Sequence, residues 1–360
     1  MKKLTNLELQ GFKSIRHLKD LQLSALNVLI GANGAGKSNL ISFFRLLNSM
    51  AVSPGELQLY IGKAGGANAL LHDGARRTPQ IEARLSVQTS AGPSGYQVCL
   101  SHAAPDTLIF ARERIREFGP WISLGAGHRE ALLMGRAEGG DPARTVLSLL
   151  KSCIVYQFHN TSATARIRGK WNAEDGCSLK EDAANLAAFL YRLRESKRDY
   201  YLRIVETIRQ IAPFFADFEL HPVDDTMLLQ WRERGTDVVF GPHQASDGSL
   251  RTFALLALLL QPEEDLPSVV ILDEPELGLH PYAIHILAGI LKSISIHVQV
   301  ILATQSVALI NCFDPEDIIV VDRSGRESTF QRLAPERLKG WLQEYSMAEL
   351  WEKNVIDGRP

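Results

Sequence analysis

A glycine-rich segment near the N-terminus carries the residues with the clearest chemistry. It reads Gly31-Ala32-Asn33-Gly34-Ala35-Gly36-Lys37-Ser38 and fits the pattern Gly-x-x-x-x-Gly-Lys-Ser/Thr. Glycines let the backbone turn its N–H groups onto phosphate oxygens, and a helix that starts at the end of the segment adds its dipole. Lys37 can neutralise the β- and γ-phosphates, and Ser38 can bind Mg²⁺. The pattern therefore predicts a site for ATP and Mg²⁺, with Asn39 at its border.

A second segment ends in two carboxylates. Val269–Leu272 is apolar and is followed by Asp273 and Glu274, which predicts a buried strand whose end delivers acids to a polar site. Asp273 suits Mg²⁺ binding, and Glu274 suits a general base or a group that positions water. A solvated strand end would give the same local pattern. The upstream segment Gly31–Ser38 favours the catalytic interpretation.

A third segment precedes a strongly apolar stretch. It reads Ser246-Asp247-Gly248-Ser249-Leu250-Arg251. Serine and glycine at the start of a helix can form an anion-binding N-terminus. An ordinary helix N-cap, with Asp247 or Ser249 as the capping residue, is the alternative. The residues of this segment alone leave both interpretations open.

Buried strands and helices that could position these segments occur at both ends of the chain. The hydrophobic pattern predicts strands at Leu26–Ile30, Gln299–Ala303 and Ile318–Asp322, and helices at Asn39–Met50, Leu250–Leu260 and Ala283–Ile294. Alternating buried strands and helices indicate a mostly parallel sheet. We therefore expect residues 1–50 and 240–330 to form a nucleotide-binding core.

The middle of the chain has a different pattern. It predicts an antiparallel meander at Ile81–Val87, Tyr96–Ser101 and Thr107–Arg112, followed by a loop over 119–145. Next come a helix at Val146–Leu150, a strand at Ser152–Phe158, helices at Lys180–Leu193 and Tyr200–Ile211, and a small sheet from Phe218–Pro222, Leu228–Arg232 and Asp237–Phe240. A further strand is predicted near the N-terminus, at Leu4–Leu9. We interpret 51–239 as an insertion made of a β meander and a helical lobe. Residues 331–360 would form a C-terminal tail.

The composition excludes few classes of function. The chain of 360 residues has a net charge of −2, which does not indicate a nucleic-acid binder but leaves room for a local basic patch. Two such clusters are Arg112–Arg116 and Ala165–Lys170, each interpretable as a solvated face or as a contact to a phosphate backbone. Trp171, Trp231, Trp341 and Trp351 are expected to be packing residues rather than platforms for base stacking.

The N-terminus and the cysteines bear on the compartment. The four cysteines lack metal-binding spacing, which favours a reducing, cytoplasmic setting. The N-terminus lacks the apolar stretch of a secretory signal, and the longest apolar run, near Phe253–Leu260, is too short to span a bilayer. His159 and His280 lie near polar segments, but neither has a second ligand at metal spacing.

In their order along the chain, these segments resemble the motifs of ABC-type ATPases of the SMC/RecF/OLD group. Ser246–Arg251 resembles the signature, Leu9–Ile15 the "Gly-Phe-Lys-Ser" opening, Leu277–Pro281 the D-loop and Ala303–Ser306 the switch. Glu344-Tyr345-Ser346 and Glu349-Leu350-Trp351 resemble a bacterial subfamily of stand-alone "AAA family" predicted ATPases. The resemblance covers essentially the whole chain.

The resemblance implies a fold, a reaction and a dimer. The fold would be α/β, a P-loop NTPase of the ABC type that forms a single domain, with a mostly parallel core sheet, an antiparallel β subdomain and an inserted helical lobe. The protein would hydrolyse ATP, with Lys37, Glu274 and Gln305 as catalytic residues and Lys13 near the nucleotide. Ser246, Asp247 and Gly248 would act on ATP held by a second copy of the chain, in an ATP-sandwiched homodimer. Gln157 would be a further ligand of Mg²⁺, although a polar residue at a strand end explains it equally well.

Two departures from the pattern and the absence of arms narrow the biological interpretation. Gln305 stands where transporters of this superfamily usually carry histidine, and the signature reads Ser-Asp-Gly-Ser-Leu. Both disfavour the ATPase subunit of a membrane transporter, and Gln305 predicts slow or partner-controlled turnover. A nucleotide switch that does not hydrolyse ATP is a further alternative, which Glu274 disfavours. Residues 51–240 lack heptads, so long SMC-type arms are not expected. The resemblance implies a role in bacterial DNA maintenance or phage defence, with a separate effector such as a nuclease and with DNA as a possible partner.

Overall fold

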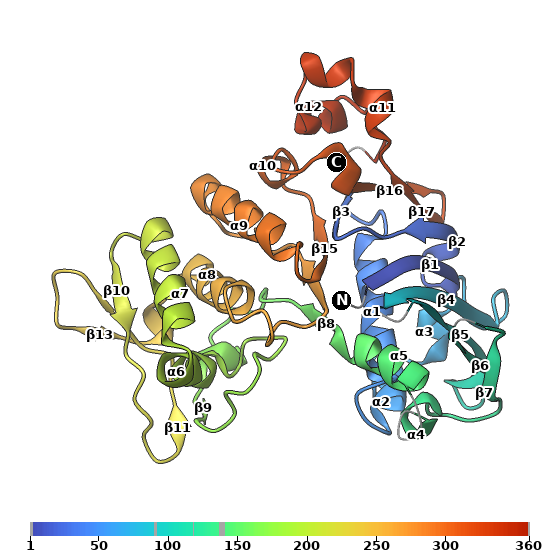
Figure 1. The fold of residues 1–360 in the computed structure, drawn as a ribbon, viewed down its shortest axis with the longest axis horizontal. Coiled ribbons are helices and arrows are strands. Elements are labelled where there is room, and N and C mark those ends of the chain that lie inside the picture. Colours follow the sequence, from blue (N-terminus) through green and yellow to red (C-terminus); the bar gives the residue numbers. More distant parts are fainter. Residues whose placement is uncertain (1–2, 90–91, 118, 137–140, 359–360) are drawn as a thin grey trace. The chain divides into compact units, whose positions relative to one another are not determined.

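A computed structural model of the chain describes residues 3–89, 92–117, 119–136 and 141–358. By their contacts, the residues form two compact units (Figure 1). Unit 1 comprises Met1–Val155, Pro267–Ile271 and Ser295–Pro360, and unit 2 comprises Tyr156–Leu266 and Leu272–Ile294. These boundaries follow packing, whereas the predicted segments 1–50, 51–239, 240–330 and 331–360 follow function. The functional grouping stays a prediction.

Unit 1 contains the predicted core sheet apart from the last residues of two strands, which belong to unit 2. Its six strands have the order β17-β16-β3-β15-β14-β8: Glu327–Arg332, Ile318–Ser324, Leu26–Ile30, Gln299–Thr304, Val269–Asp273 and Cys153–Tyr156. Strand β3 pairs in parallel with β15 and β16, while β17 is antiparallel to β16. Every residue of β3 and β15 is buried, as expected for strands that are covered on both faces. The predicted strands and their parallel arrangement are confirmed, and β17 is an addition that the sequence pattern did not reveal.

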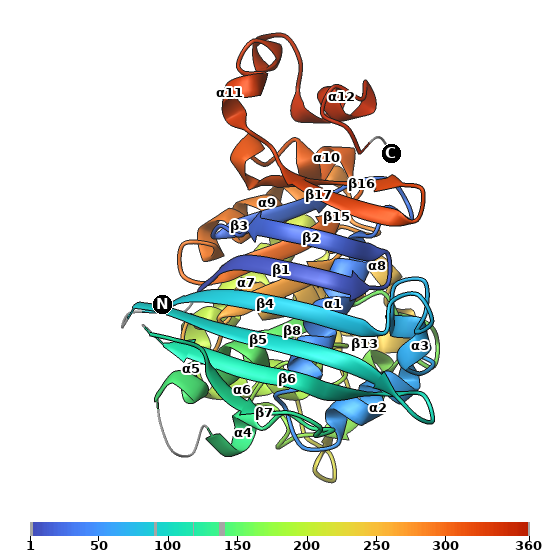
Figure 2. The same ribbon diagram turned by 90° about the vertical axis from the view of Figure 1, so that its right-hand side faces the viewer.

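A second sheet of unit 1 is antiparallel. Its order is β2-β1-β4-β5-β6-β7: Ile15–Gln22, Lys3–Phe12, Gln80–Thr89, Gly92–Ala103, Thr107–Glu117 and Ile122–Gly125. The strands alternate between buried and more exposed residues, so that one face is apolar and the other polar. Figure 2 shows the six strands side by side with no helix in front of them. The predicted meander β4-β5-β6 is confirmed.

Helices complete unit 1. They are α1 (Lys37–Ser49), α2 (Glu56–Lys63), α3 (Ala67–Leu70), α4 (Leu133–Arg136), α5 (Asp141–Ser152), α10 (Val307–Ile310), α11 (Pro335–Leu338) and α12 (Met347–Glu352). The predicted loop over 119–145 is wrong in part, because β7, α4 and the start of α5 lie within it; its residues 137–140 lie outside the described part. Glycines hide the periodicity there, although isolated apolar side chains such as Leu133 and Ala143 are buried.

One buried amide fastens the two sheets of unit 1 together. The Gln299 side chain, at the start of β15, accepts a hydrogen bond from the Leu4 N–H at 2.9 Å and donates to the Leu4 carbonyl at 2.7 Å. It also donates to the Ser24 carbonyl at 2.8 Å. The side chain thus pairs with β1 as a neighbouring strand would. Gln299 is fully buried, so these bonds satisfy backbone groups that water cannot reach.

Unit 2 combines helices with two small sheets. The helices are α6 (Leu186–Ser196), α7 (Arg198–Ile211), α8 (Asp247–Leu259) and α9 (Pro281–Ile294). The predicted small sheet is present with shifted bounds, as β10 (Phe215–Phe218), β12 (Trp231–Glu233) and β13 (Val239–Phe240); β9 (Trp171–Asn172) pairs with β11 (Thr226–Met227). Phe215, Phe218 and Trp231 pack around Phe253 of α8. The predicted packing role is confirmed for Trp231, as it is for the fully buried Trp351 of unit 1, whereas Trp341 is 46% exposed.

Helix α6 begins later than its predicted start at Lys180. The buried Asn185 explains the difference, because its side chain accepts from the Lys180 N–H at 3.0 Å and donates to the carbonyls of Asp175 at 2.6 Å and Ser178 at 2.8 Å. These bonds organise residues 175–185 as a loop around one amide. Asparagine commonly competes with the helix in this way.

We predict that Gln299→Leu destabilises unit 1 by about 2–4 kcal/mol, because it leaves both backbone groups of Leu4 buried without their partner. Urea unfolding monitored by tryptophan fluorescence measures the effect. Gln331→Leu, on the exposed side of β17, is the matched control and should change stability by less than about 0.5 kcal/mol. Equal stability of the two variants would show that the amide does not fasten the sheets.

Candidate functional site

The glycine-rich segment lies at the carboxyl edge of the core sheet in unit 1. Gly31–Ser38 directly follows β3, and Gln305 directly follows β15. Ile30 and Thr304 are register partners, so both segments leave the sheet side by side. The Gln305 amide donates to the Asn33 side-chain oxygen at 2.7 Å. The structure therefore brings together the predicted phosphate segment and the predicted switch residue.

Gly34 and Gly36 are two of the positions at which the backbone of the segment needs glycine. Gly34 and Gly36 have φ values of 77° and 119°, in the region that disfavours other residues. A Cβ atom on Gly36 would also lie 2.1 Å from the Ser328 hydroxyl oxygen. Lys37 is buried, and its Nζ donates to the carbonyls of Gly31 at 2.6 Å and Ala32 at 3.1 Å. The predicted nucleotide residues Gly31 to Asn39 thus form one closed turn at the start of α1.

A chain of hydrogen bonds supports this turn from behind. The Asn39 amide donates to the Ser14 hydroxyl at 2.6 Å, Ser14 lies 2.6 Å from the Ser328 hydroxyl, and Ser328 donates to the Ala35 carbonyl at 2.5 Å. The donors run in one direction, because an amide N–H and a carbonyl oxygen fix the two ends. We call Ser14, Ser328 and Asn39 the serine brace. No local pattern connects residues 14 and 328, so the sequence could not reveal the brace.

Lys13 contacts α1. Its Nζ donates to the Ser42 hydroxyl at 2.6 Å, and its backbone has a φ of 47°. Burial and the nearby Arg45 lower the pKa of Lys13. The contact places the ammonium group beside the first turns of α1, and its predicted contact with a nucleotide stays a prediction.

Unit 2 contains the carboxylates. Asp273 ends β14, and the Gln157 amide donates to its Oδ2 at 3.2 Å, so these two predicted metal residues lie together. The next residue, Glu274, has a φ of 44°, an uncommon and strained value for a residue with a side chain. The His159 ring lies between Gln157 and Glu274. Its Nδ1 is 3.1 Å from the Gln157 amide nitrogen, and its Nε2 is 3.4 Å from the Glu274 carbonyl oxygen.

The donor types suit Mg²⁺ better than a transition metal. Asp273 offers carboxylate oxygens and Ser38 a hydroxyl, and both are hard oxygen ligands. Within residues 3–89, 92–117, 119–136 and 141–358, no group of three His, Cys, Asp or Glu side chains could hold a metal ion. Proteins usually bind Mg²⁺ through one or two side chains, with substrate phosphates and water as the other ligands. Each of these oxygen donors suits that mode, whereas a zinc site would need a set of nitrogen or sulfur ligands.

The signature segment is the start of α8. Ser246 is the N-cap, since its hydroxyl accepts from the Ser249 N–H at 3.0 Å. The alternative of an ordinary N-cap is confirmed, but the capping residue is Ser246 rather than Asp247 or Ser249, and Asp247 pairs with Arg168 at 3.0 Å. A Cβ atom on Gly248 would lie 2.7 Å from the Gly278 carbonyl, so packing against the D-loop requires this glycine. Contact of the segment with ATP stays a prediction.

Arg168 was predicted only as part of the basic cluster Ala165–Lys170. It is buried and donates to the carbonyls of Thr161 and Pro242 as well as to Asp247. It therefore fixes the residues that lead into the signature segment, and it is neither a solvated residue nor a phosphate contact. In the same cluster, the Arg166 guanidinium stacks 4.5 Å from the centre of the Trp171 ring.

Arg251 connects three segments of unit 2 and was not predicted as a functional residue. From α8 it donates to the carbonyls of Phe158 at 3.3 Å, His159 at 3.1 Å and Leu277 at 3.1 Å. One guanidinium thus joins the signature helix to the segment after β8 and to the D-loop. Arginine can donate several hydrogen bonds from one planar group, which lysine cannot do in the same geometry.

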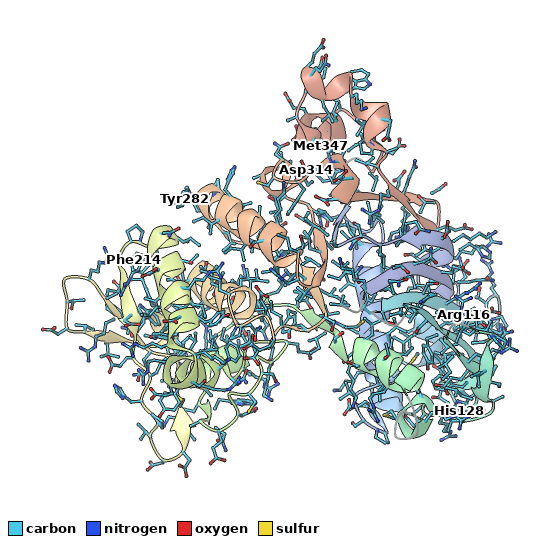
Figure 3. All side chains as sticks on the ribbon, in the orientation of Figure 1. Arg116, His128, Phe214, Tyr282, Asp314 and Met347 are labelled. Atoms are coloured by element: carbon cyan, nitrogen blue, oxygen red, sulfur yellow. The ribbon has the colours of Figure 1, made fainter. Side chains whose placement is uncertain are left out.

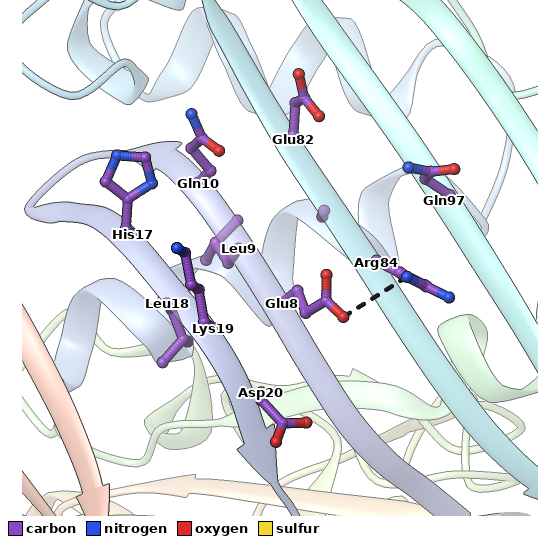
Figure 4. A pocket seen from close by; sticks show the side chains of 11 residues that line it. Glu8, Leu9, Gln10, His17, Leu18, Lys19, Asp20, Glu82, Arg84 and Gln97 are labelled. Carbon is purple, nitrogen blue, oxygen red and sulfur yellow. Dashed lines mark ion pairs between the residues drawn. The ribbon is translucent and has the colours of Figure 1, made fainter.

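The outer face of the antiparallel sheet carries arginines on neighbouring strands, here named the arginine face: Arg84, Arg112, Arg114 and Arg116. Arg116 is labelled in Figure 3. Figure 4 shows the ion pair between Arg84 and Glu8, whose charged atoms lie 3.8 Å apart. The two residues line a cavity of about 350 Å³. The Trp121 ring lies 5.3 Å from the Arg84 guanidinium and 5.1 Å from that of Arg116. The sequence had indicated Arg112–Arg116 but not Trp121.

No described helix is both long and apolar enough to cross a membrane.

Among proteins with curated descriptions, none matches the chain. A family model described as "AAA domain, putative AbiEii toxin, Type IV TA system" matches residues 26–98 and 105–311, which include every motif from the phosphate loop to the switch.

Solved structures of SMC heads share the fold. A structure titled as the SmcHead bound to the C-winged helix domain of ScpA is 15% identical, with a TM-score of 0.62, over 94% of this chain and 99% of that one. An Smc head with an extended coiled coil, bound to the C-terminal domain of ScpA derived from Pyrococcus furiosus, is 15% identical with a TM-score of 0.56, over 96% and 99% of the two chains. The SMC head domain from Thermotoga maritima is 14% identical with a TM-score of 0.50, over 92% and 99%.

The family match covers most of the chain, and the structural matches cover nearly all of it. They agree with the order of motifs along the sequence and with the two sheets of unit 1. The α/β fold, with a parallel core sheet and an antiparallel sheet, is thereby confirmed. The chain belongs to the family described as "AAA domain, putative AbiEii toxin, Type IV TA system", and its fold is that of the solved SMC head domains.

Proposed function

We propose that this protein binds ATP with Mg²⁺ at Gly31–Ser38 and hydrolyses its β–γ bond. The observation that carries the proposal is the braced turn at the start of α1, with the buried Lys37 inside it and Gln305 bonded to Asn33. Such a turn directs backbone N–H groups and a helix N-terminus at one point, which suits a polyphosphate. A glycine-rich turn without this role would not need a buried lysine.

Each residue has a proposed part in the reaction. Lys37 and the backbone N–H groups of the turn stabilise charge on the transferring phosphoryl group. Ser38 and Asp273 would hold Mg²⁺, which would neutralise charge on the phosphate oxygens, and Gln157 supports Asp273. Glu274 orients and deprotonates the attacking water, and Gln305 contacts the γ-phosphate.

The signature segment is proposed to act between two copies of the chain. Ser246 is exposed at the N-terminus of α8, a helix of 13 residues whose dipole favours an anion. In a two-fold dimer, Ser246, Asp247 and Gly248 of each copy would close over the ATP held by the other. ATP would then control assembly, and hydrolysis would release the dimer.

The biological role is proposed to be DNA maintenance or phage defence, in a cytoplasmic complex with a separate effector such as a nuclease. Two of the solved SMC heads are bound to ScpA, which shows that heads of this fold accept a protein partner. The matched family description names a toxin and a toxin–antitoxin system, which also involves a second component. The arginine face supports DNA as a further partner, since guanidinium groups and an aromatic ring are common contacts to nucleic acid.

A nucleotide switch without hydrolysis is the second candidate. Gln305 favours it, because an amide cannot transfer a proton as the more usual histidine can. The carboxylate of Glu274 favours hydrolysis. Phosphate release by the purified protein separates the two.

We predict that Glu274→Gln lowers the rate of phosphate release by at least about 100-fold, because the amide cannot accept a proton from water. The same variant should persist as a dimer in saturating ATP, which light scattering measures as twice the monomer mass. Lys37→Ala is the control: it should lose both hydrolysis and ATP-dependent dimerisation, because it lacks the charge that binds the phosphates. A Glu274→Gln variant that stays monomeric in ATP would contradict the dimer, and one that retains the wild-type rate would contradict the role of Glu274.

The DNA partner yields a separate prediction. Replacing both Arg114 and Arg116 with glutamine should weaken binding to duplex DNA and reduce the salt dependence of log K by about two phosphate contacts. Fluorescence anisotropy over a range of salt concentrations, with and without ATP, measures both quantities. Arg203→Gln on α7 is the control for loss of a surface charge. Absence of DNA binding by the wild type at low salt in every nucleotide state would exclude this partner.

A further inference from the structure

Four residues of unit 2 form a continuous hydrogen-bonded relay. Gln157 donates to Asp273 Oδ2 at 3.2 Å and lies 3.1 Å from Nδ1 of His159, whose Nε2 lies 3.4 Å from the Glu274 carbonyl oxygen. The relay therefore links the side chain of one carboxylate to the backbone of the other. Nothing in the sequence motifs assigns His159 to it.

The chemistry of the partners fixes the direction of every bond. Asp273 is an acceptor, so the Gln157 group that faces it is the amide NH₂, which has two protons to donate. The second proton goes to His159, so Nδ1 is the acceptor in that bond. Nε2 therefore carries the ring proton and donates to the Glu274 carbonyl.

The backbone of Glu274 is in need of support. Its φ of 44° is unfavourable for a residue with a side chain, and such a conformation persists only where neighbouring contacts hold it. The Glu274 carbonyl accepts from His159 and, within the turn, from the Leu277 N–H at 3.2 Å. His159 is itself held by Arg251, which donates to the His159 carbonyl at 3.1 Å.

We propose that His159 is a positioning residue for Glu274. It holds the left-handed backbone from which the Glu274 side chain extends, and through Gln157 it ties that backbone to the orientation of Asp273. The inference rests on the proposed hydrolysis of ATP, in which Glu274 acts on water. It predicts that loss of His159 slows the chemical step and leaves the affinity for ATP unchanged.

The first test compares His159→Leu with His159→Gln. The leucine variant lacks both hydrogen bonds, whereas a glutamine amide at this position can still donate to the Glu274 carbonyl. We expect kcat to fall about 10–100-fold in His159→Leu, with the Kd for ATP within about twofold of the wild type, and to recover at least partly in His159→Gln. His221→Leu, at an exposed histidine of the same unit, is the matched control. An unchanged kcat in His159→Leu, or a parallel loss of ATP affinity, would overturn the proposal.

A double-mutant cycle separates positioning from general damage. If His159 acts through Glu274, His159→Leu should have no further effect on the residual rate of Glu274→Gln. If the substitution merely damages unit 2, the two losses will multiply. Multiplicative losses would therefore contradict the proposal.

A second readout does not depend on hydrolysis. In nucleotide-free protein, His159→Leu should speed hydrogen exchange of the Leu277 amide, which is bonded to the Glu274 carbonyl, by about tenfold, while His159→Gln should not. Mass spectrometry of the peptide that contains residues 274–279 measures this. Faster exchange without any hydrolysis by the wild type would support the positioning role and refute the proposed reaction. Unchanged exchange would refute the positioning role whatever the activity.

Discussion

The segment Gly31–Ser38 depends on hydrogen bonds that hold its carbonyl groups in place. The serine brace does this by fixing the Ala35 carbonyl from behind. Ser14 belongs to the turn between β1 and β2, and Ser328 belongs to β17. The conformation of Gly31–Ser38 therefore depends on both the antiparallel sheet and the core sheet. Gln299 joins the same two sheets through β1. The proposed nucleotide site of unit 1 thus depends on both sheets of the unit.

Unit 2 uses a comparable arrangement around one arginine. Arg251 of α8 binds carbonyls of the segment after β8 and of the D-loop, and Gly248 packs against the D-loop carbonyl of Gly278. The helix that carries the signature is therefore fastened to the segment that carries Glu274. His159 completes this connection through the Glu274 backbone. In the proposed dimer, the residues that close over one ATP are tied in this way to those that act on the other.

The sequence predicted what depends on local pattern. Buried strands such as β3 and β15, the glycine-rich turn and the acids at the end of β14 carry short-range signals, and the structure has each of these elements where expected. Side-chain bonds between distant residues carry no such signal, so the roles of Ser328, Arg168 and Gln299 could not be predicted. Element ends were displaced where one buried polar group reorganised the backbone, as Asn185 does before α6. At the start of α8, Ser246 rather than Asp247 is the N-cap, and Asp247 forms an ion pair with Arg168.

The claim that the site is shared between two copies can be tested by mixing two inactive variants. Lys37→Ala removes the phosphate contact, and Ser246→Asp keeps an N-cap but places a negative charge where the γ-phosphate of the other copy would lie. Ser246→Asn, a neutral cap, should remain active. Equal amounts of the two inactive variants should regain phosphate release, because a site with the intact Lys37 of one copy and the intact Ser246 of the other can form only in the mixed dimer. A mixture that stays inactive, while Ser246→Asn is active, would contradict the shared site.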